Sequence, residues 1–600
     1  MNEVLAKNYQ TLGSQYQTLY NSKRKQIKLI SLGRFISFVG IFPIYFYLNA
    51  YSNILAIVAS MLLLSSFLFL IKLFIKTEKK MEFYQRLVEI NQNEAGALKR
   101  NFSPFDPGNE FTDPHHDYSF DLDLFGIGSM FQFLNRTVTN RGKDHLAALL
   151  NQSQHPVQEI SEKQIAIQEL AEELNWRQQF MAWGKETENQ KIPNRTDEFL
   201  GQFIGLKSVK TVNYLLKTLP VLTLLFVGFS LAGLLINAFF LIAIFSQWII
   251  FILYSKTISR FHKQFESQSK RLGRYSNLLH LIEMKHFQSS YLVLLKEKLT
   301  KEGKAASSIT AELQKILNEF DYRQNILVGF LLNSVFLWDL RCIYRMFLWQ
   351  QKYSAELPVW FEVIAEMDAL ISMANCNYNH PEWNMPKLTD SGFQVKAVGL
   401  GHPLIDESRC IKNSFKISGE EQIAIITGAN MAGKSTFLRT MGINLILAAN
   451  GCKVCASDFE FSPVRVFTNM RTSDNLMNDE SYFYAELLRL QTMLTLLRNG
   501  TNLFVIVDEM LKGTNSVDKL NGSKDLIRQL IALKTHGIVA THDLGLTELA
   551  DIYPGSVKNQ CFEVQLQNEE LNFDYKLTDG VTRTMNATFL MKKMGIIPKD

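Results

Sequence analysis

The chain has 600 residues, and 63 Lys and Arg against 58 Asp and Glu give a net charge of +5. Hydrophobic residues make up 47% and charged residues 20%, which excludes a disordered or fibrous chain. The net charge is too small to indicate nucleic-acid binding by electrostatics alone. Six cysteines are too few for a disulfide scaffold and favour a reducing compartment. At roughly 150 residues per domain, the length predicts about four domains.

Two long stretches without a charged residue predict membrane hairpins. They run from Phe35 to Ile71 and from Thr218 to Ser255, and each has nearly twice the ~20 residues that one span requires. Asn49–Asn53 has turn chemistry, and Asn237 lies near the middle of the second stretch. The predicted spans are near 33–49 and 53–75 in the first hairpin, and near 217–236 and 238–255 in the second.

Basic residues flank both hairpins, whereas the short turns carry none. The positive-inside rule then predicts a multi-pass membrane protein in which both termini, and everything after residue 256, are cytoplasmic. A pair of buried hairpins in a large soluble protein is the alternative, but core helices seldom remain uncharged for so long. The flanking residues are Lys23, Arg24, Lys25, Lys28, Arg34, Lys72, Lys76, Lys79, Lys80, Lys207, Lys210, Lys217, Lys256, Arg260 and Lys263.

The remaining segments before the C-terminal third carry weaker signals. Three prolines and a glycine within Asn101–Asp117 predict a linker. The Glu- and Gln-rich run 157–190 predicts the solvated faces of helices. Further on, Cys452 and Cys455 have C-x-x-C spacing without the further ligands of a zinc site or a thioredoxin-like context. We interpret both cysteines as small packed residues.

A phosphate-binding loop follows the short β-branched run Ile423–Thr427, which predicts a buried strand. The loop reads Gly428-Ala-Asn-Met-Ala-Gly433-Lys434-Ser435-Thr436, the pattern G-x-x-x-x-G-K-[ST], and a helical pattern comes next. Glycines allow backbone N–H groups to surround phosphates, and the helix N-terminus adds positive charge. Lys434 is predicted to reach the β- and γ-phosphates, and Ser435 to bind Mg²⁺.

Two further predicted strands end in polar residues: Asp508 and Glu509 follow the first, and His542 follows the second. An Asp at a strand end can hold Mg²⁺, and the next Glu can orient the attacking water. A His here can contact the γ-phosphate. This pattern suggests the ABC-type branch of P-loop ATPases, in which two domains meet over each nucleotide. Ser481, at the start of a predicted amphipathic helix, then either caps that helix alone or receives a partner's γ-phosphate.

The same residues resemble the MutS family, over about 400–595. Asn-Met inside the loop is distinctive of the MutS P-loop. Weaker similarity upstream matches the start of the MutS helical core and the helix that returns to the ATPase, so the second hairpin falls where MutS has its lever helices. The segments that carry the resemblance are Gly401–Leu404, Thr427–Thr436, Asp508–Asn515 and Ala540–Leu549, and more faintly Leu134–Gly142 and Val363–Ala374.

The resemblance implies ATP and Mg²⁺ as ligands and a homodimer through the ATPase domains. Glu509 would be the base, His542 the γ-phosphate sensor, and Ser481 a residue that acts in trans. Leu511-Lys512 stands where the family favours Gly-Arg. The usual aromatic residue before the P-loop strand is absent, so Tyr575 is either the adenine-stacking residue or a packed strand tyrosine. The other predicted ligands of nucleotide or metal are Gly428, Asn430, Met431, Gly433, Lys434, Ser435, Thr436 and Asp508.

The sequence supports DNA binding less strongly than it supports ATP binding. MutS mismatch sensors begin with a globular domain that carries a Phe-x-Glu wedge, and neither 1–80 nor 81–130 offers a segment long enough for it. Basic residues after the second hairpin either bind phosphate backbone or, as we favour, anchor the chain on anionic lipid. They are Lys256, Arg260, Lys263, Lys270, Arg271 and Arg274.

We therefore predict an α/β P-loop domain of ABC type at the C-terminus, preceded by an all-α, MutS-core-like region that contains transmembrane hairpins. The function we adopt is a membrane-anchored ATPase that acts on mismatched or branched DNA in repair or recombination. The alternative is an ABC-like ATPase that drives membrane remodelling or transport without nucleic acid. The predicted divisions are 1–80 (basic helix and hairpin 1), 81–214 (linker and core-like helices), 215–255 (hairpin 2), 256–380 (lever-like helices) and 381–600 (ATPase).

Overall fold

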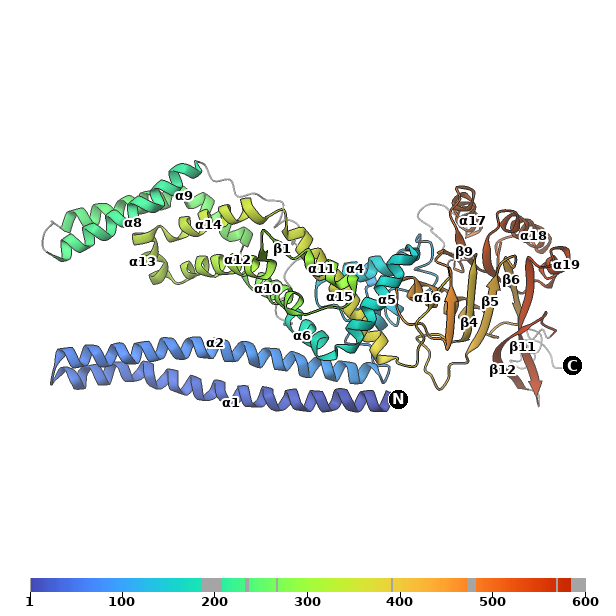
Figure 1. Ribbon diagram of the computed structural model, residues 1–600, viewed down its shortest axis with the longest axis horizontal. Helices are drawn as coiled ribbons and strands as arrows, with labels where there is room; N and C mark the ends of the chain where they lie inside the picture. The colour runs from blue at the N-terminus through green and yellow to red at the C-terminus, as the bar shows by residue number, and fades with distance from the viewer. Residues whose placement is uncertain are drawn as a thin grey trace. The chain divides into compact units, whose positions relative to one another are not determined.

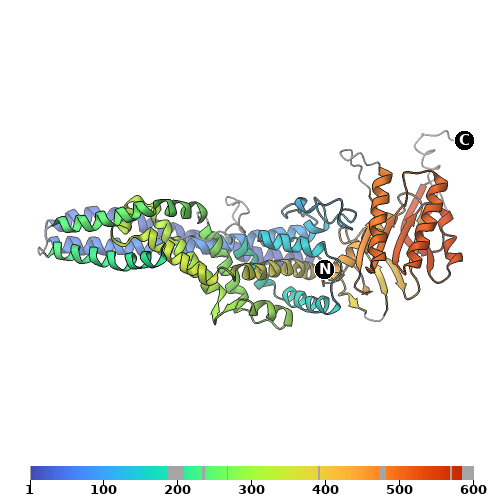
Figure 2. The same cartoon turned by 90° about the horizontal axis from the view of Figure 1, so that it is seen from above.

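A computed structural model of the chain describes residues 2–185, 208–232, 237–265, 268–389, 392–471, 482–567 and 570–583. The chain is mostly helical, and its two larger sheets lie in the C-terminal part (Figure 1 and Figure 2). It divides into two compact units. The first unit comprises residues 1–137, 143–177 and 369–600, and the second comprises 138–142 and 178–368.

The first unit begins with two long antiparallel helices, α1 (Asn2–Asn49) and α2 (Asn53–Ala97), which lie side by side (Figure 1). The N–H groups of Tyr51 and Ser52 both donate to the carbonyl oxygen of Leu48 and close the turn where the sequence predicts it. The helix runs well beyond residue 80, the predicted end of this segment. The reason is that its last turns bury apolar side chains such as Leu87 and Ile90.

A buried polar network binds the start of α1 and the end of α2, which lie at the opposite end of the hairpin from its turn. Tyr9 donates to Asn379 Oδ1 (2.8 Å), at the end of α15 (Leu357–Asn379), and Asn379 Nδ2 donates to Glu94 Oε2 (3.0 Å). Arg136 forms an ion pair with Glu94, and 1% of the Glu94 side chain is exposed. A buried carboxylate is stable only when it is paired in this way. The network therefore fixes the base of the hairpin to the rest of the unit.

A six-stranded sheet forms the centre of the C-terminal domain, in the order β12-β11-β6-β10-β9-β8. All strands but β12 run parallel, so the carboxyl ends of β6, β10 and β9 meet at one edge. Apolar residues of the sheet and of α17 and α18 form its core. The elements are β6 (Ile423–Gly428), α16 (Lys434–Ala449), β8 (Arg465–Asn469), α17 (Tyr482–Arg498), β9 (Leu503–Asp508), α18 (Ser516–Ala532), β10 (His536–Thr541), η4 (Leu544–Leu546), α19 (Leu549–Ile552), β11 (Val557–Gln567) and β12 (Glu570–Asp579).

The C-terminal part also contains a smaller, four-stranded sheet in the order β3-β7-β4-β5. Its strands are β3 (Lys387–Leu388), β4 (Gln394–Leu400), β5 (Asn413–Ser418) and β7 (Asp458–Phe461). The helices between α2 and residue 185 are η1 (Asn109–Phe111), α3 (Met130–Leu134), α4 (Asn140–Leu150), α5 (Val157–Glu172) and α6 (Leu174–Gly184).

The second unit contains another antiparallel hairpin, α8 (Val209–Leu231) and α9 (Asn237–Phe265). Among the described residues, four helices are long and apolar enough to cross a membrane, namely Glu3–Asn49, Asn53–Ala97, Val209–Ser230 and Leu241–His262. The rest of this unit consists of α10 (Gln268–Met284), α11 (Ser290–Glu297), β1 (Thr300–Lys301), β2 (Lys304–Ala305), α12 (Ala306–Phe320), η3 (Asp321–Gln324), α13 (Ile326–Phe336), α14 (Trp338–Tyr353) and most of α15.

The two upstream segments that resemble MutS meet in this unit. Asp368 on α15 accepts hydrogen bonds from the backbone N–H groups of Val138 and Thr139 and from the Thr139 hydroxyl (2.7 Å). A Cβ atom at Gly142 would be 2.2 Å from Asp368 Oδ2, so only glycine fits there. Burial raises the pKa of Asp368 to about 7, although these hydrogen bonds act to lower it.

Candidate nucleotide-binding site

The loop predicted to bind phosphate joins β6 to α16. Gly428 (φ +157°) and Gly433 (φ +110°) lie at its two ends. A Cβ atom at Gly428 would be 2.9 Å from the carbonyl oxygen of Phe562, so the strand can end there only with glycine. The first turn of α16, which begins at Lys434, offers backbone N–H groups at the loop. This strand–loop–helix arrangement is typical of anion-binding loops.

Lys434 is buried in this loop, with 5% of its surface exposed. Its Nζ donates to the carbonyl oxygens of Gly428 (2.7 Å) and Ala429 (3.1 Å) and lies 3.2 Å from Nε2 of His542. Burial lowers the pKa of Lys434, and two nearby carboxylates oppose that shift. The amino group of Lys434 is thus fixed between the loop and His542.

Ser435 and Asp508 lie together beneath the loop. The Ser435 hydroxyl donates to Asp508 Oδ2 at 2.5 Å, and Asp508 is the last residue of β9. A hydroxyl and a carboxylate are the hard oxygen donors that Mg²⁺ prefers, and Mg²⁺ usually takes its other ligands from phosphate and water. The described residues contain no cluster of three or more His, Cys, Asp or Glu side chains that could hold a metal ion without such help.

Glu509 and His542 face each other across the ends of β9 and β10. His542 Nε2 lies 2.8 Å from Glu509 Oε1. The hydrogen bond from His542 lowers the pKa of Glu509 to about 2, although partial burial opposes it. Glu509 has a left-handed backbone (φ +57°), which is strained for a residue other than glycine. Lys434, His542 and Glu509 thus form one contiguous polar site, as the order β6-β10-β9 requires.

A carboxylate that the sequence did not single out for function holds the loop after Glu509. Glu486, on α17, is 1% exposed and accepts hydrogen bonds from the backbone N–H groups of Leu511 (2.6 Å) and Lys512 (3.1 Å). Leu511 has φ +56°, in the region that favours glycine. This explains why the MutS pattern prefers Gly there, and it gives Glu486 the task of holding a strained turn. A Glu on an amphipathic helix gives no sequence signal of its own for this role.

A cavity of about 300 Å³ lies beside the loop, and Tyr575 is part of its wall. Tyr575 Cδ1 is 3.2 Å from the position of a Cβ atom at Gly433, so the ring packs directly on the loop. His402, in the His-Pro element, also lines the cavity, and burial lowers its pKa to about 4. The complete lining is Leu400, His402, Ile405, Arg409, Cys410, Ile411, Asn413, Gly433, Thr436, Phe437, Thr440, Phe562 and Tyr575.

The other residues predicted to bind nucleotide lie on the loop, beside the cavity or outside the described residues. Asn430 and Met431 are exposed on the loop, and 76% of Met431 is accessible. Thr436 lines the cavity. Ser481 lies outside the described residues, which resume at Tyr482. The structure therefore brings together the predicted groups from three strands, but it does not describe the one predicted to act in trans.

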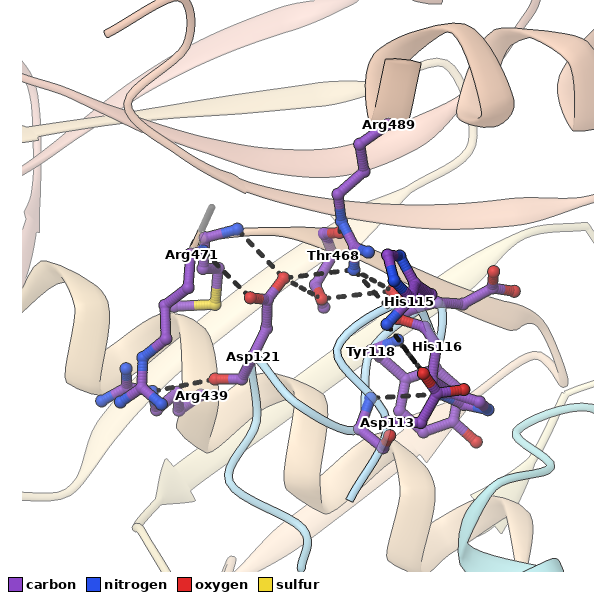
Figure 3. A network of polar contacts seen from close by, with 12 residues as sticks. Asp113, His115, His116, Tyr118, Asp121, Arg439, Thr468, Arg471 and Arg489 are labelled. Carbon is purple, nitrogen blue, oxygen red and sulfur yellow. Dashed lines mark hydrogen bonds and ion pairs between the residues drawn. The ribbon is translucent and has the colours of Figure 1, made fainter. Parts of the chain in front are cut away.

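A second polar network joins residues 113–124, which we call the connector, to this domain (Figure 3). Asp121 is 1% exposed and accepts hydrogen bonds from Thr468 Oγ1 (2.6 Å) and from the backbone N–H groups of two residues just after β8. Arg489 on α17 lies 3.4 Å from the same carboxylate. A carboxylate with this many donors is firmly held.

The connector also contacts the helix of the phosphate-binding loop. Arg439 on α16 donates to the carbonyl oxygen of Asp121 (3.1 Å), and Arg471 forms a two-pronged ion pair with Asp123 (2.5 and 3.1 Å). Arg471 precedes the segment 472–481 and Arg489 follows it, so the connector binds the chain on both sides of that segment. The sequence predicted only a linker up to residue 117. The prolines that suggested it indicate irregular backbone, which can still be packed.

Comparison with known proteins points to the same domain. A family model described as MutS domain V matches residues 424–599. The chain is 33% identical over 249 residues to DNA mismatch repair protein MSH4 of Arabidopsis thaliana, which is 40% of this chain and 31% of that protein. DNA mismatch repair protein MutS of Thermotoga maritima is 30% identical over 239 residues, or 39% of this chain and 29% of that protein. The corresponding protein of Ehrlichia ruminantium is 31% identical over 247 residues, or 41% and 30%.

These matches cover about three tenths of the length of each relative. The range matched by the family model contains the loop of Lys434, the Asp508-Glu509 pair and His542. The resemblance predicted from the motifs is thus confirmed for the C-terminal domain, whose residues 424–599 match MutS domain V.

Proposed function

We propose that the chain is a membrane-anchored ATPase of ABC type, which binds and hydrolyses ATP with Mg²⁺ where the C-terminal domains of two copies meet, and which acts on DNA in repair or recombination. The observation that carries the proposal is the single polar site formed by Lys434, the Ser435–Asp508 pair and the Glu509–His542 pair. Loop, metal donors and a candidate base lie within hydrogen-bond reach of one another, as phosphoryl transfer requires.

In the proposed reaction, water attacks the γ-phosphorus of ATP. A P–O bond to the water oxygen forms, the bond from the γ-phosphorus to the β–γ bridging oxygen breaks, and ADP and phosphate leave. Glu509 accepts the proton from the water, and Lys434 balances the charge on the β- and γ-phosphates. Ser435 and Asp508 would hold Mg²⁺, which supplies positive charge to the same phosphate oxygens.

The Glu509–His542 pair bears on when this site is active. A carboxylate with a pKa of about 2 is a weak base, and general bases work best when their pKa is nearer the working pH. If His542 turns its hydrogen bond to the γ-phosphate, Glu509 loses its main stabilising partner and becomes more basic. Without nucleotide, the hydrogen bond between His542 and Glu509 therefore keeps Glu509 a weak base. Binding of ATP would break this hydrogen bond and make Glu509 active.

Three features support the remaining parts of the proposal. Four apolar helices with exposed surfaces suit two membrane hairpins, with both termini cytoplasmic. Ser481 precedes α17, where a residue acting in trans on a partner's nucleotide would lie in an ABC-type homodimer. The relatives carry the name DNA mismatch repair protein, which is the reason to propose mismatched or branched DNA as a partner.

An ATPase that remodels or transports across the membrane without nucleic acid is the second candidate. It is favoured by α2, which runs unbroken from its apolar part to Glu94 in the polar network at its base. Movement in the first unit would then reach the membrane directly.

Phosphate release by the full chain in lipid nanodiscs separates the two candidates. We expect duplex, mismatched or branched DNA to stimulate hydrolysis several-fold, and the stimulation to decline steeply as salt rises, because phosphate contacts release counterions. Stimulation by anionic lipid, with no response to any DNA form at low salt, would instead support the second candidate. No hydrolysis under any condition would contradict both.

Glu486→Gln tests the support of the loop after Glu509. The glutamine amide places an N–H group opposite one of the two backbone donors at Leu511 and Lys512, so the strained turn loses a partner. We expect kcat for ATP hydrolysis to fall about tenfold, since one lost hydrogen bond to a charged group corresponds to roughly 1.5–3 kcal/mol. The dissociation constant of ATP should change less than kcat.

Gln491→Ala is the matched control, because Gln491 is exposed on the same helix. Its kcat should equal that of the unchanged protein. If Glu486→Gln weakened ATP binding and kcat equally, the residue would serve the fold of the domain rather than the position of Glu509.

A further inference from the structure

α13 is a short apolar helix of the second unit that no predicted span includes. Residues 324–338 contain no charged residue. One face of α13 turns Gly329, Asn333 and Ser334 inward, where they are buried. The other face is exposed by 53% to 84% at Ile326, Leu327, Phe330 and Leu331. A contiguous apolar surface of this kind marks contact with another apolar phase.

The inward face of α13 packs on the middle of α9. Gln247 Nε2 donates to the carbonyl oxygen of Val335 (3.0 Å), and Trp248 Nε1 donates to Ser334 Oγ (3.0 Å). Lys256 is the first charged residue on α9 after its apolar part, about eight residues beyond Trp248. At about 1.5 Å per residue, α13 therefore contacts α9 about 12 Å inside the charged boundary of the hairpin.

The same region satisfies several polar groups that would be costly in lipid. The carbonyl oxygen of Val335 lies in the last turn of α13, where a helix leaves carbonyls without internal partners, and Gln247 satisfies it. Asn333 donates to the carbonyl oxygen of Gly329 and accepts from the N–H of Asp339 (both 3.0 Å). Backbone and side-chain groups at membrane depth need such internal partners.

The two ends of α13 return to one place. Nε of Arg323, before the helix, lies 3.5 Å from Oδ2 of Asp339, after it, and the rings of Tyr322 and Trp338 lie parallel with centroids 6.5 Å apart. Tyr and Trp are typical of the membrane interface. A helix of 11 residues is about 16 Å long, half of the ~30 Å hydrocarbon core. Together with α14, from which it is bent by 74°, it has the length and composition of a broken span or of a re-entrant loop. Because the two ends of α13 lie together, the second arrangement, in which the segment enters and leaves on one side, fits better.

We propose that α13 lies in the cytoplasmic leaflet, with its exposed face against lipid acyl chains, as a membrane element that packs on α8 and α9 without spanning. Acyl chains fit better than a protein partner because α9 also exposes Phe245 (71%) and Ile249 (50%) within a turn of the α13 contact. The apolar surface thus continues from one helix to the other at the same depth. The inference rests on the proposed membrane anchoring.

Site-directed spin labels on the full chain in lipid vesicles test it. Leu327→Cys and Leu331→Cys are labelled with a nitroxide, with the half-buried Cys410 changed to Ala in every variant, since the other native cysteines are buried. Collisions with oxygen, which concentrates in lipid, are compared with collisions with a water-soluble nickel chelate. Leu253→Cys on α9 (74% exposed) is the lipid reference, and Ile165→Cys on α5 (59% exposed) is the water reference.

We expect the ratio of oxygen to nickel accessibility at positions 327 and 331 to match that at 253 and to exceed that at 165 several-fold. High nickel accessibility at 327 and 331, with 253 in lipid, would overturn the inference and leave the anchoring intact. Low accessibility to both reagents would mean that protein covers α13, which would also overturn it. If 253 itself were open to nickel, the anchoring and the inference would both fail.

Discussion

Glu509→Gln is expected to lower the rate of ATP hydrolysis by about 100-fold or more, because general-base catalysis of this kind contributes ~10²–10⁴-fold. Glutamine has nearly the shape of glutamate and can still contact His542, but it cannot accept the proton of the attacking water. ATP binding should therefore remain, and the two-copy state with bound ATP should accumulate. Steady-state phosphate release, ATP titration and particle mass with ATP and Mg²⁺ measure the three quantities on the full chain in detergent.

Glu548→Gln is the matched control for this experiment. Glu548 lies in the same domain, 65% of its side chain is exposed, and it pairs with Lys524 outside the site. Surface pairs of this kind contribute little, so hydrolysis should be unchanged. Hydrolysis by Glu509→Gln at the normal rate would show that another group is the base. A mass that stays at one copy with ATP bound would contradict the proposed dimer.

Lys434→Ala is expected to weaken ATP binding by about 100-fold or more. The lysine Nζ supplies the positive charge in the loop, and charge-assisted hydrogen bonds to phosphate are each worth roughly 1.5–3 kcal/mol. Without nucleotide, the same Nζ satisfies the carbonyl oxygens of Gly428 and Ala429, so the substitution also leaves two buried acceptors short of a donor. ATP binding, measured by titration, and ATP hydrolysis, measured by phosphate release, should both be lost.

Two further variants separate binding from folding. Lys434→Met keeps most of the length and packing of the side chain and loses the charge and the N–H donors, and it should lose ATP binding as fully as alanine does. Lys387→Ala removes a largely exposed lysine that pairs with Asp458 in the smaller sheet, and it should bind ATP normally. Normal ATP binding by Lys434→Met would mean that the loop holds phosphate through its backbone alone.

The parts of the site that follow strands could be predicted because their signals are local. Ile423–Thr427 is a continuous β-branched run, and the glycine spacing of the loop fits the left-handed backbone at Gly433. Asp508 and His542 each stand directly after an apolar strand. Parallel strands in one sheet then bring such residues to the same edge, so three separate local patterns were enough to assemble the polar site.

The residues that support the site could not be predicted in this way. Glu486 binds N–H groups 25 and 26 positions further along the chain, and Asp121 binds Thr468 across 347 positions. Each is an ordinary acidic residue in its own neighbourhood. α13 was missed for a different reason: its 11 residues fall below the ~18–20 apolar residues by which a membrane span is recognised. Its proposed place in the membrane rests on its contacts with α9.

The connector lies in the chain between the first hairpin and the nucleotide domain, and the nucleotide domain binds it through Asp121. Asp121 is gripped by α16 and α17 at once, through Arg439 and Arg489, and it lies about 24 positions downstream of the last residue of α2. If α17 rotates against α16 during a catalytic cycle, either the hydrogen bonds and ion pair of Asp121 must break or the connector must move with the helices. With Asp121 intact, the connector would transmit this rotation toward the first hairpin. With the contacts of Asp121 weakened, ATP hydrolysis would continue while less of the movement reached the hairpin.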